Sequence, residues 1–274
     1  MVDTLRLEIL PIAVEARFQP FDLAAEIWNC TVKRNLGLED GDILVVSSKY
    51  AAVSEGRMIE LSKISVGEKA KSISEKYDLD PALAQLILDE SEFVFGGIPG
   101  FVLSLTRGTL APNAGYDKSN VPKGWVIQYP KDPFATAHAL REHLLERANS
   151  DGKGRINRLG VILSDSRVTP TRLGTVGVAV SYSGIKPTLD MRGTTDLLGN
   201  TLVVTLRGVA DQLATTAQLV MGESNEGRPI VIIRGFNDAF GEARNDFEKK
   251  STITPEQCLI LRSLKNPCDS EQRS

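Results

Sequence analysis

Cysteine and histidine are scarce in this chain of 274 residues. Cys30, Cys258 and Cys268 are odd in number and widely spaced, so they predict neither a disulfide framework nor a thiolate zinc site. His138 and His143 are the only histidines, and their spacing places them on different sides of a helix. Histidine-based triads and His-rich zinc sites are therefore disfavoured. Any chemistry must rest on carboxylates, basic side chains and a metal ion.

Long apolar runs and an excess of charge of either sign are also missing. No apolar run approaches the roughly 20 residues that span a bilayer, and the start, MVDTLRLEIL, lacks the pattern of a signal peptide. We therefore expect a cytoplasmic protein with no membrane partner. The 32 Lys and Arg nearly balance the 35 Asp and Glu, so there is no basic field to attract nucleic acid. We expect no nucleic-acid partner.

Two familiar nucleotide-binding signatures are absent. No G-x-G-x-x-G follows a strand, so the sequence does not predict a Rossmann fold. The segment 222–227 has the first half of a phosphate loop, but Arg228 and Pro229 stand where Lys and Ser or Thr belong, and a strand follows instead of a helix. A P-loop fold is therefore also excluded. A turn bounded by glycines can still expose backbone amides that bind an anion, although it can equally be an ordinary turn.

Apolar periodicity predicts an α+β (mixed α/β) fold, a two-part unit of mixed and antiparallel sheets with flanking helices. Strands are expected at 5–10, 43–47, 160–163, 176–180, 201–206 and 229–235, with further short strands joined by turns over 99–130. Helices are expected from about Asp22, from Asp80 and Pro81, over 133–148, and from Val209 to Gly222.

A polar stretch at 149–155 (NSDGKGR) is the best candidate for a connection between two parts. It divides the chain into an N-terminal α/β part, residues 1–148, and a C-terminal part, residues 156–245. The C-terminal part is expected to carry metal and nucleotide loops. Residues 246–274 are expected to form a helical or frayed tail.

Three segments expected to be loops carry an acid among small residues. The acids are Asp117, Asp165 and Glu223. Magnesium is usually held by one or two carboxylates together with phosphate oxygens and water, and the Ser166 hydroxyl can complete such a shell. The alternative is that Asp and Gly in these loops only make turns.

Two basic residues, Lys49 and Arg172, follow predicted strands. Either side chain can hold a phosphate or a carboxylate. The alternative is that both are ordinary surface charges.

Four segments resemble the coenzyme F420-0:L-glutamate ligases. They are NAGYDKSNV at 113–121, GVILSDS with the downstream GTVGVAV within 160–180, MRGTTDLLGN at 191–200, and ADQLATTAQLVMGESNEGRPIVIIRG at 210–235. Several unrelated loops match in the correct order, which makes the resemblance specific.

The resemblance implies a ligation driven by GTP. The terminal carboxylate of coenzyme F420-0 is activated as an acyl phosphate, and the amine of L-glutamate displaces the phosphate. Mg²⁺ or Mn²⁺ is required, with K⁺ as a further candidate ion, and the family members are homodimers.

The resemblance also implies roles for individual residues. Its metal ligands correspond to Asp117, Asp165, Ser166 and Glu223. Its nucleotide contacts correspond to Ser48, Asn120, Leu219, Val220, Met221, Gly222, Glu223, Ser224, Asn225 and Glu226. We take Asp117, Asp165 and Arg172 as the candidate catalytic residues.

This sequence departs from the family pattern at three places. Val53 stands where the family commonly has a Lys, and Lys49 is a candidate to reach the same phosphate. Val168 and Thr169 replace the usual glycine and arginine after the second metal aspartate, and 13–17 matches the family's leucine-proline loop poorly.

These departures keep two alternatives open. One is a related nucleotide-dependent ligase with another carboxylate acceptor or amine. The other is a catalytically silent protein that binds nucleotide or deazaflavin, against which the intact acids argue.

Overall fold

The computed structural model describes residues 6–151, 155–240 and 251–265 of the chain. These fall into two compact units. Unit 1 lies within Met1–Ser65 and Gly115–Glu248, and unit 2 within Val66–Ala114 and Lys249–Ser274. The connection expected at 149–155 lies inside unit 1, so this division does not coincide with the expected one.

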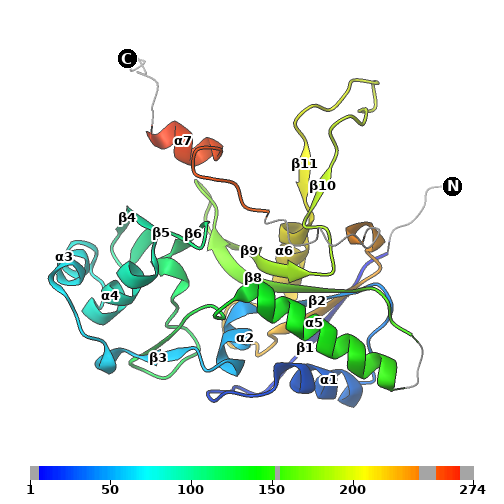
Figure 1. Ribbon diagram of the computed structural model, residues 1–274, viewed down its shortest axis with the longest axis horizontal. Helices are drawn as coiled ribbons and strands as arrows, with labels where there is room; N and C mark the ends of the chain where they lie inside the picture. Colours follow the sequence, from blue (N-terminus) through cyan, green and yellow to red (C-terminus); the bar gives the residue numbers. More distant parts are fainter. Residues whose placement is uncertain (1–5, 152–154, 241–250, 266–274) are drawn as a thin grey trace. The chain divides into compact units, whose positions relative to one another are not determined.

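A five-stranded mixed sheet organises unit 1 (Figure 1). Its strand order is β1-β12-β2-β8-β9. The bounds are β1 (Glu8–Ile12), β2 (Asp42–Ser47), β8 (Leu159–Val168), β9 (Thr175–Ser183) and β12 (Ile230–Arg234). Strands β2 and β8 pair in parallel, and the other three pairs are antiparallel. The predicted α+β class with mixed and antiparallel sheets is thereby confirmed.

Helices cover both faces of this sheet. They are α1 (Leu23–Lys33), α5 (Pro133–Ser150) and α6 (Val209–Met221). Leu44 and Val46 of β2 belong to the core cluster that includes α1 and α5, whereas Ile43 and Val45 belong to the cluster that includes α6. This alternation follows from the two-residue period of a strand. A strand buried on both faces must be apolar along its whole length, which explains the run that predicted β2.

Smaller elements complete unit 1. Strand β3 (Met58–Glu60) pairs with β7 (Trp125–Ile127), and β10 (Thr188–Asp190) pairs with β11 (Leu206–Gly208). The short helix α2 (Ser48–Ser54) follows β2 directly, and η1 (Leu61–Lys63), η2 (Asn113–Gly115) and η3 (Asn237–Ala239) are single 3₁₀ turns. The β10–β11 pair carries a long protruding loop (Figure 1).

Unit 2 consists of helices and an antiparallel three-stranded sheet of order β4-β5-β6. Its elements are α3 (Glu68–Tyr77), α4 (Pro81–Glu90), β4 (Phe93–Ile98), β5 (Phe101–Thr106), β6 (Thr109–Pro112) and α7 (Leu259–Lys265).

Helix starts are confirmed where an Asp cap marked them. The Asp22 carboxylate accepts from the Ala25 amide, and the Asp80 carboxylate accepts from the Ala82 amide with Pro81 at the first helical position. Each carboxylate satisfies an amide that the first turn leaves without a partner. None of the helices that the structure describes is long and apolar enough to cross a membrane.

Two strand predictions need correction. Strand β8 runs to Val168, well past the predicted 160–163, because its polar half finds backbone partners in β9. The strand predicted at 201–206 is wrong: only Leu206 lies in a strand, β11. Val203 and Val204, whose apolar character suggested the strand, are 73% and 81% exposed, so no core holds this segment.

Two of the three cysteines lie within the described ranges. Cys30 is buried, Cys258 is half-buried, and both are free thiols. Cys268 lies outside the described residues, as do 241–245 of the predicted C-terminal part and 246–250 and 266–274 of the predicted tail.

Candidate functional site

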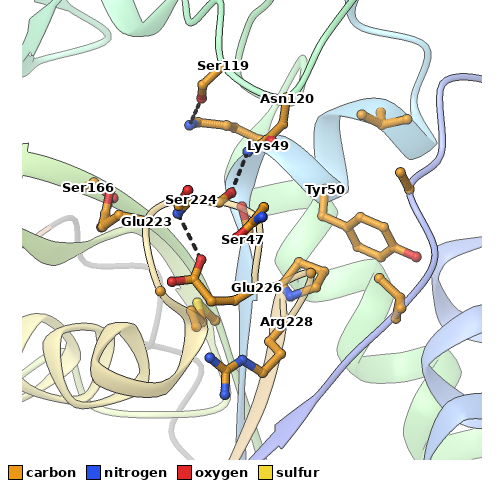
Figure 2. A pocket seen from close by; sticks show the side chains of 18 of the residues that line it. Ser47, Lys49, Tyr50, Ser119, Asn120, Ser166, Glu223, Ser224, Glu226 and Arg228 are labelled. Atoms are coloured by element: carbon orange, nitrogen blue, oxygen red, sulfur yellow. Dashed lines mark hydrogen bonds between the residues drawn. The ribbon is translucent and has the colours of Figure 1, made fainter.

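A pocket of about 390 Å³ opens beside the ends of β2 and β8 in unit 1. Its lining residues come from five segments that are distant in the sequence: 14–17, 119–121, 164–166, parts of 47–53 and parts of 218–229, together with Ile127 and Gly177. Figure 2 shows several of these side chains around the cavity. The predicted residues that line it are Lys49, Asn120, Asp165, Ser166, Met221, Gly222, Glu223, Ser224, Asn225 and Glu226.

Strand β8 supplies Asp165 and Ser166 from within a strand, not from a loop as expected. The β8–β9 register shifts between Leu163 and Ser164, directly before these residues. Such irregularities re-aim the side chains that follow them. Ser166 Oγ donates to Glu223 Oε1 at 2.7 Å, and Gln218 Nε2 donates to Ser166 Oγ at 3.1 Å. The strand and the end of α6 are thereby joined at one polar cluster.

The Asp165 side chain leaves the face of β8 opposite to that of Ser166. Its side chain is 16% exposed, and Tyr129 Oη donates to Asp165 Oδ2 at 2.5 Å. Burial raises the pKa of Asp165 above its ordinary value, because a low-dielectric surrounding disfavours the carboxylate. The Tyr129 hydroxyl and the Arg167 guanidinium act in the opposite direction.

Asp117 is tied to the pocket through Lys49. The ammonium of Lys49 forms an ion pair with Asp117 and donates to Ser119 Oγ at 2.9 Å (Figure 2). The Ser119 amide donates to Asp117 Oδ1 at 2.6 Å. Burial disfavours the Asp117 carboxylate, but these donors outweigh burial and hold its pKa below the ordinary value. Asp117 itself does not line the cavity, whereas Lys49 and Ser119 do.

The turn after α6 presents its backbone amides to a carboxylate. Helix α6 ends at Gly222, whose φ of 78° favours glycine. The Ser224 amide donates to Glu226 Oε2 at 2.8 Å (Figure 2), and backbone amides of the turn, Ser224 first, hold the pKa of Glu226 below its usual range. Asn120 Nδ2 donates to the Ser224 carbonyl at 3.3 Å, which ties the turn to the segment after Asp117. The turn has the geometry of an anion nest, with its own Glu226 as the anion.

The donor set of the pocket suits a hard divalent cation. Within 6–151, 155–240 and 251–265, no three Asp, Glu, His or Cys residues gather closely enough to hold a metal by themselves. Mg²⁺, however, is usually bound by one or two carboxylates plus phosphate oxygens and water. Asp165 and Glu223 both line this cavity and supply two such carboxylates, and the Ser166 hydroxyl contacts Glu223. The residues present therefore fit Mg²⁺ or Mn²⁺ bound together with a phosphate group.

Besides Asp117, four predicted residues do not line the cavity. Ser48 is buried in the first turn of α2, Leu219 is 80% exposed on α6, and Val220 packs against the core on the α6 side of the sheet. Arg172 is exposed in the turn between β8 and β9 and does not line the pocket.

Sequence reasoning missed Tyr129, Arg167 and Gln218. Arg167 follows Asp165 by two residues, so a prediction that β8 continued would have placed both on one face. Gln218 lies one helical turn before Gly222 on α6, a position that the helix pattern could have indicated. Tyr129 meets Asp165 only through the fold, 36 residues away along the chain, and no local pattern indicates it.

Fold and pocket together define an α+β protein with a ligand-sized cavity whose carboxylates, hydroxyls and backbone amides come from separate segments, as in sites that bind and transform small molecules. The family model described as "F420-0:Gamma-glutamyl ligase" matches residues 18–235. This chain belongs to that family, as the resemblance predicted, and is an enzyme of this type.

Individual relatives agree with the family model. The "Coenzyme F420:L-glutamate ligase" of Methanopyrus kandleri is 38% identical, over 85% of this chain and 87% of its own length. The protein of the same name from Archaeoglobus fulgidus is 36% identical, over 95% of this chain and 99% of its own. The protein of that name from Methanocaldococcus jannaschii is 39% identical, over 82% of this chain and 86% of its own length.

Proposed function

We propose that this enzyme attaches L-glutamate to the terminal carboxylate of coenzyme F420-0, using GTP and a divalent cation. Family membership and the names of the relatives support the acceptor and the amino acid. The observation that carries the phosphate chemistry is one pocket in which Asp165, Ser166 and Glu223 lie beside a turn of exposed amides.

The reaction takes two displacements. A carboxylate oxygen of F420-0 bonds to the γ-phosphorus of GTP, the bond to the bridging oxygen breaks, and an acyl phosphate and GDP result. The glutamate amine then attacks the acyl carbon, phosphate leaves with the bonding electrons, and the amine loses a proton to solvent. Both steps place charge on phosphate oxygens, so positioned positive groups matter more than a strong protein base.

The residues of the pocket divide these tasks. Asp165, Glu223 and Ser166 would hold Mg²⁺ or Mn²⁺, which neutralises charge on phosphate oxygens when bound. The amides of 222–226 and the Asn120 side chain hold the nucleotide. Lys49 shifts from Asp117 toward the phosphates. Val53 lines the same pocket but carries no charge, so Lys49 takes the place of the lysine that the family commonly has there.

We further propose a homodimer in the cytoplasm. The loop between β10 and β11 exposes Leu197, Leu198, Val203 and Val204, which are 104%, 88%, 73% and 81% exposed. Contiguous exposed apolar groups indicate a surface that another protein covers, and a second copy is the proposed partner. A solution mass of one chain would contradict this proposal.

K⁺ stays a candidate ion for the reaction. Replacing K⁺ with Na⁺ in the assay tests whether the reaction depends on it.

The function is tested by product formation. The protein is mixed with F420-0, L-glutamate, GTP and Mg²⁺, and the product is analysed by mass spectrometry. We expect a product that is heavier than F420-0 by one glutamyl unit. We also expect one phosphate to be released for each product molecule. Phosphate release only with another carboxylate or amine would indicate the related ligase, and nucleotide binding without phosphate release would indicate a silent binding protein.

Glu226→Gln is expected to tighten GTP binding severalfold, because the neutral amide no longer repels phosphate and holds the Ser224 amide less strongly than a carboxylate does. The wild-type carboxylate holds the Ser224 amide and repels phosphate. Titration with a fluorescent GTP analogue measures the change, with Glu75→Gln on the exposed face of α3 as the matched control. Equal or weaker binding by Glu226→Gln would show that the carboxylate does not compete with the nucleotide.

A further inference from the structure

Asp165 is held by two side chains to which the proposed reaction gives no task. Tyr129 Oη donates to Asp165 Oδ2 at 2.5 Å, and Arg167 Nη2 donates to Tyr129 Oη at 3.2 Å. Arg167 Nε lies 4.0 Å from the same Oδ2. The three side chains contact one another, and Tyr129 Oη and Arg167 Nε both approach Oδ2 of the carboxylate.

We propose that Tyr129 and Arg167 are positioning residues that fix Oδ2 of Asp165 and so turn the carboxylate toward the cation and phosphate in the pocket. The inference rests on the proposed function of that pocket. A carboxylate anchored at one oxygen keeps a single orientation, and the groups that orient a metal ligand control the affinity for the metal.

The position of Tyr129 is set by backbone. Its residue is 6% exposed, and its ring lies directly against Gly115. A Cβ atom at Gly115 would come within 2.3 Å of Tyr129 Cε2, so the ring occupies space that only glycine leaves. Gly115 also has a φ of 80°, which favours glycine. The Tyr129 ring therefore has little freedom to move, and its hydroxyl is held in place beside Asp165.

The position of Arg167 is set by the strand. Asp165 and Arg167 are two residues apart in β8, so their side chains leave the same face, while Ser166 leaves the other face toward α6. The side chains of Asp165 and Arg167 are only 16% and 15% exposed. A carboxylate that is largely shielded from solvent needs a paired cation and hydrogen-bond donors to stay ionised. Arg167 supplies the charge and Tyr129 supplies the directed hydrogen bond.

The alternative is that the cluster only stabilises the fold. A structural role affects the melting temperature and every ligand alike. A positioning role affects the metal selectively, because only the metal depends on the orientation of Asp165. Metal binding, nucleotide binding and thermal stability must therefore be measured on the same variants.

Tyr129→Phe tests the hydrogen bond alone, because it removes one oxygen and keeps the ring. Binding of Mn²⁺ in the presence of GDP is measured from the paramagnetic resonance signal of free Mn²⁺. We expect Mn²⁺ affinity to fall 10- to 100-fold, the usual effect of losing a group that orients a metal ligand. GDP affinity without metal and the KM for glutamate are expected to stay unchanged. Tyr182→Phe, in the core next to α6 and not lining the pocket, is the matched control.

Arg167 provides a second, independent variant. Arg167→Met is expected to weaken Mn²⁺ binding as Tyr129→Phe does, and Arg167→Lys, which keeps the charge, is expected to restore part of it. Wild-type Mn²⁺ affinity in both Tyr129→Phe and Arg167→Met would overturn the positioning role and leave the proposed function intact. Equal losses for Mn²⁺ and GDP with a lower melting temperature would also overturn it. A wild-type protein that forms glutamylated product but binds no Mn²⁺ would overturn it too, whereas absence of product is a failure of the proposed function.

Discussion

Asp165→Asn is expected to lower the rate of glutamyl ligation on the order of 10³-fold, because a preorganised charge at a reacting phosphate supplies several kcal/mol of transition-state stabilisation. The amide keeps the shape of the carboxylate, and its carbonyl oxygen can still accept from Tyr129. It carries no negative charge for the cation. Initial rates of product formation at saturating GTP and Mg²⁺ measure the loss.

The fold of this variant is expected to stay intact. Asp165 is a largely buried carboxylate, and a neutral amide in its place removes the cost of burying that charge but leaves the equally buried Arg167 guanidinium without an anionic partner. The melting temperature is therefore expected to fall while the protein stays folded. Asp238→Asn, an exposed acid in η3, is the matched control and should retain full activity. A near-normal rate for Asp165→Asn would remove this residue from the site.

The sequence was sufficient for elements whose signals are local. Asp22 and Asp80 mark helix starts because their carboxylates bond amides two or three residues away. Strand β2 is recognisable because both of its faces are buried, so every position is apolar. In each case the residues that carry the signal are the residues that form the element.

The polar half of β8 shows where local signals end. Asp165 to Arg167 are polar and precede Pro170, so they are typical of a loop. They form a strand because β9 offers paired backbone groups to β8 as far as Val168. The opposite error arose at Val203 and Val204, which are apolar but have no partner surface among the residues that the structure describes. Tertiary pairing decides both cases, and it is not encoded in any short window.

The sequence predicted those parts of the candidate site that are acids, or a hydroxyl beside an acid, in polar segments. Asp165, Ser166 and Glu223 were identified that way, and the structure places all three on one cavity. The groups that hold them were not identified. Tyr129 and Gln218 are ordinary residues in their own segments and acquire a role only through contacts with β8. Arg172, chosen for its sequence position, lies outside the pocket, and Arg167 contacts the site instead.

Lys49→Met is expected to lower kcat/KM for GTP about 100-fold, the usual cost of losing one positioned donor to a transferring phosphate. Lys49 lines the pocket at the start of α2 and forms an ion pair with Asp117. A phosphate in the pocket offers its ammonium a second anion. The effect is measured from initial rates over a range of GTP concentrations. Lys63→Met, an exposed lysine paired with Glu60, is the matched control.

The result for the metal separates two roles of Lys49. If its ammonium contacts phosphate, Lys49→Met weakens GTP binding while the Mn²⁺ concentration for half-maximal rate stays the same or falls, because Asp117 loses a competing cation. If Lys49 serves only to neutralise Asp117, the double variant Lys49→Met with Asp117→Asn is no worse than Asp117→Asn alone, since paired residues are not additive. Unchanged GTP affinity in Lys49→Met would reject the phosphate contact. We expect the double variant to have a lower kcat/KM for GTP than either single variant, because the Lys49 ammonium still contacts phosphate when Asp117 no longer binds it.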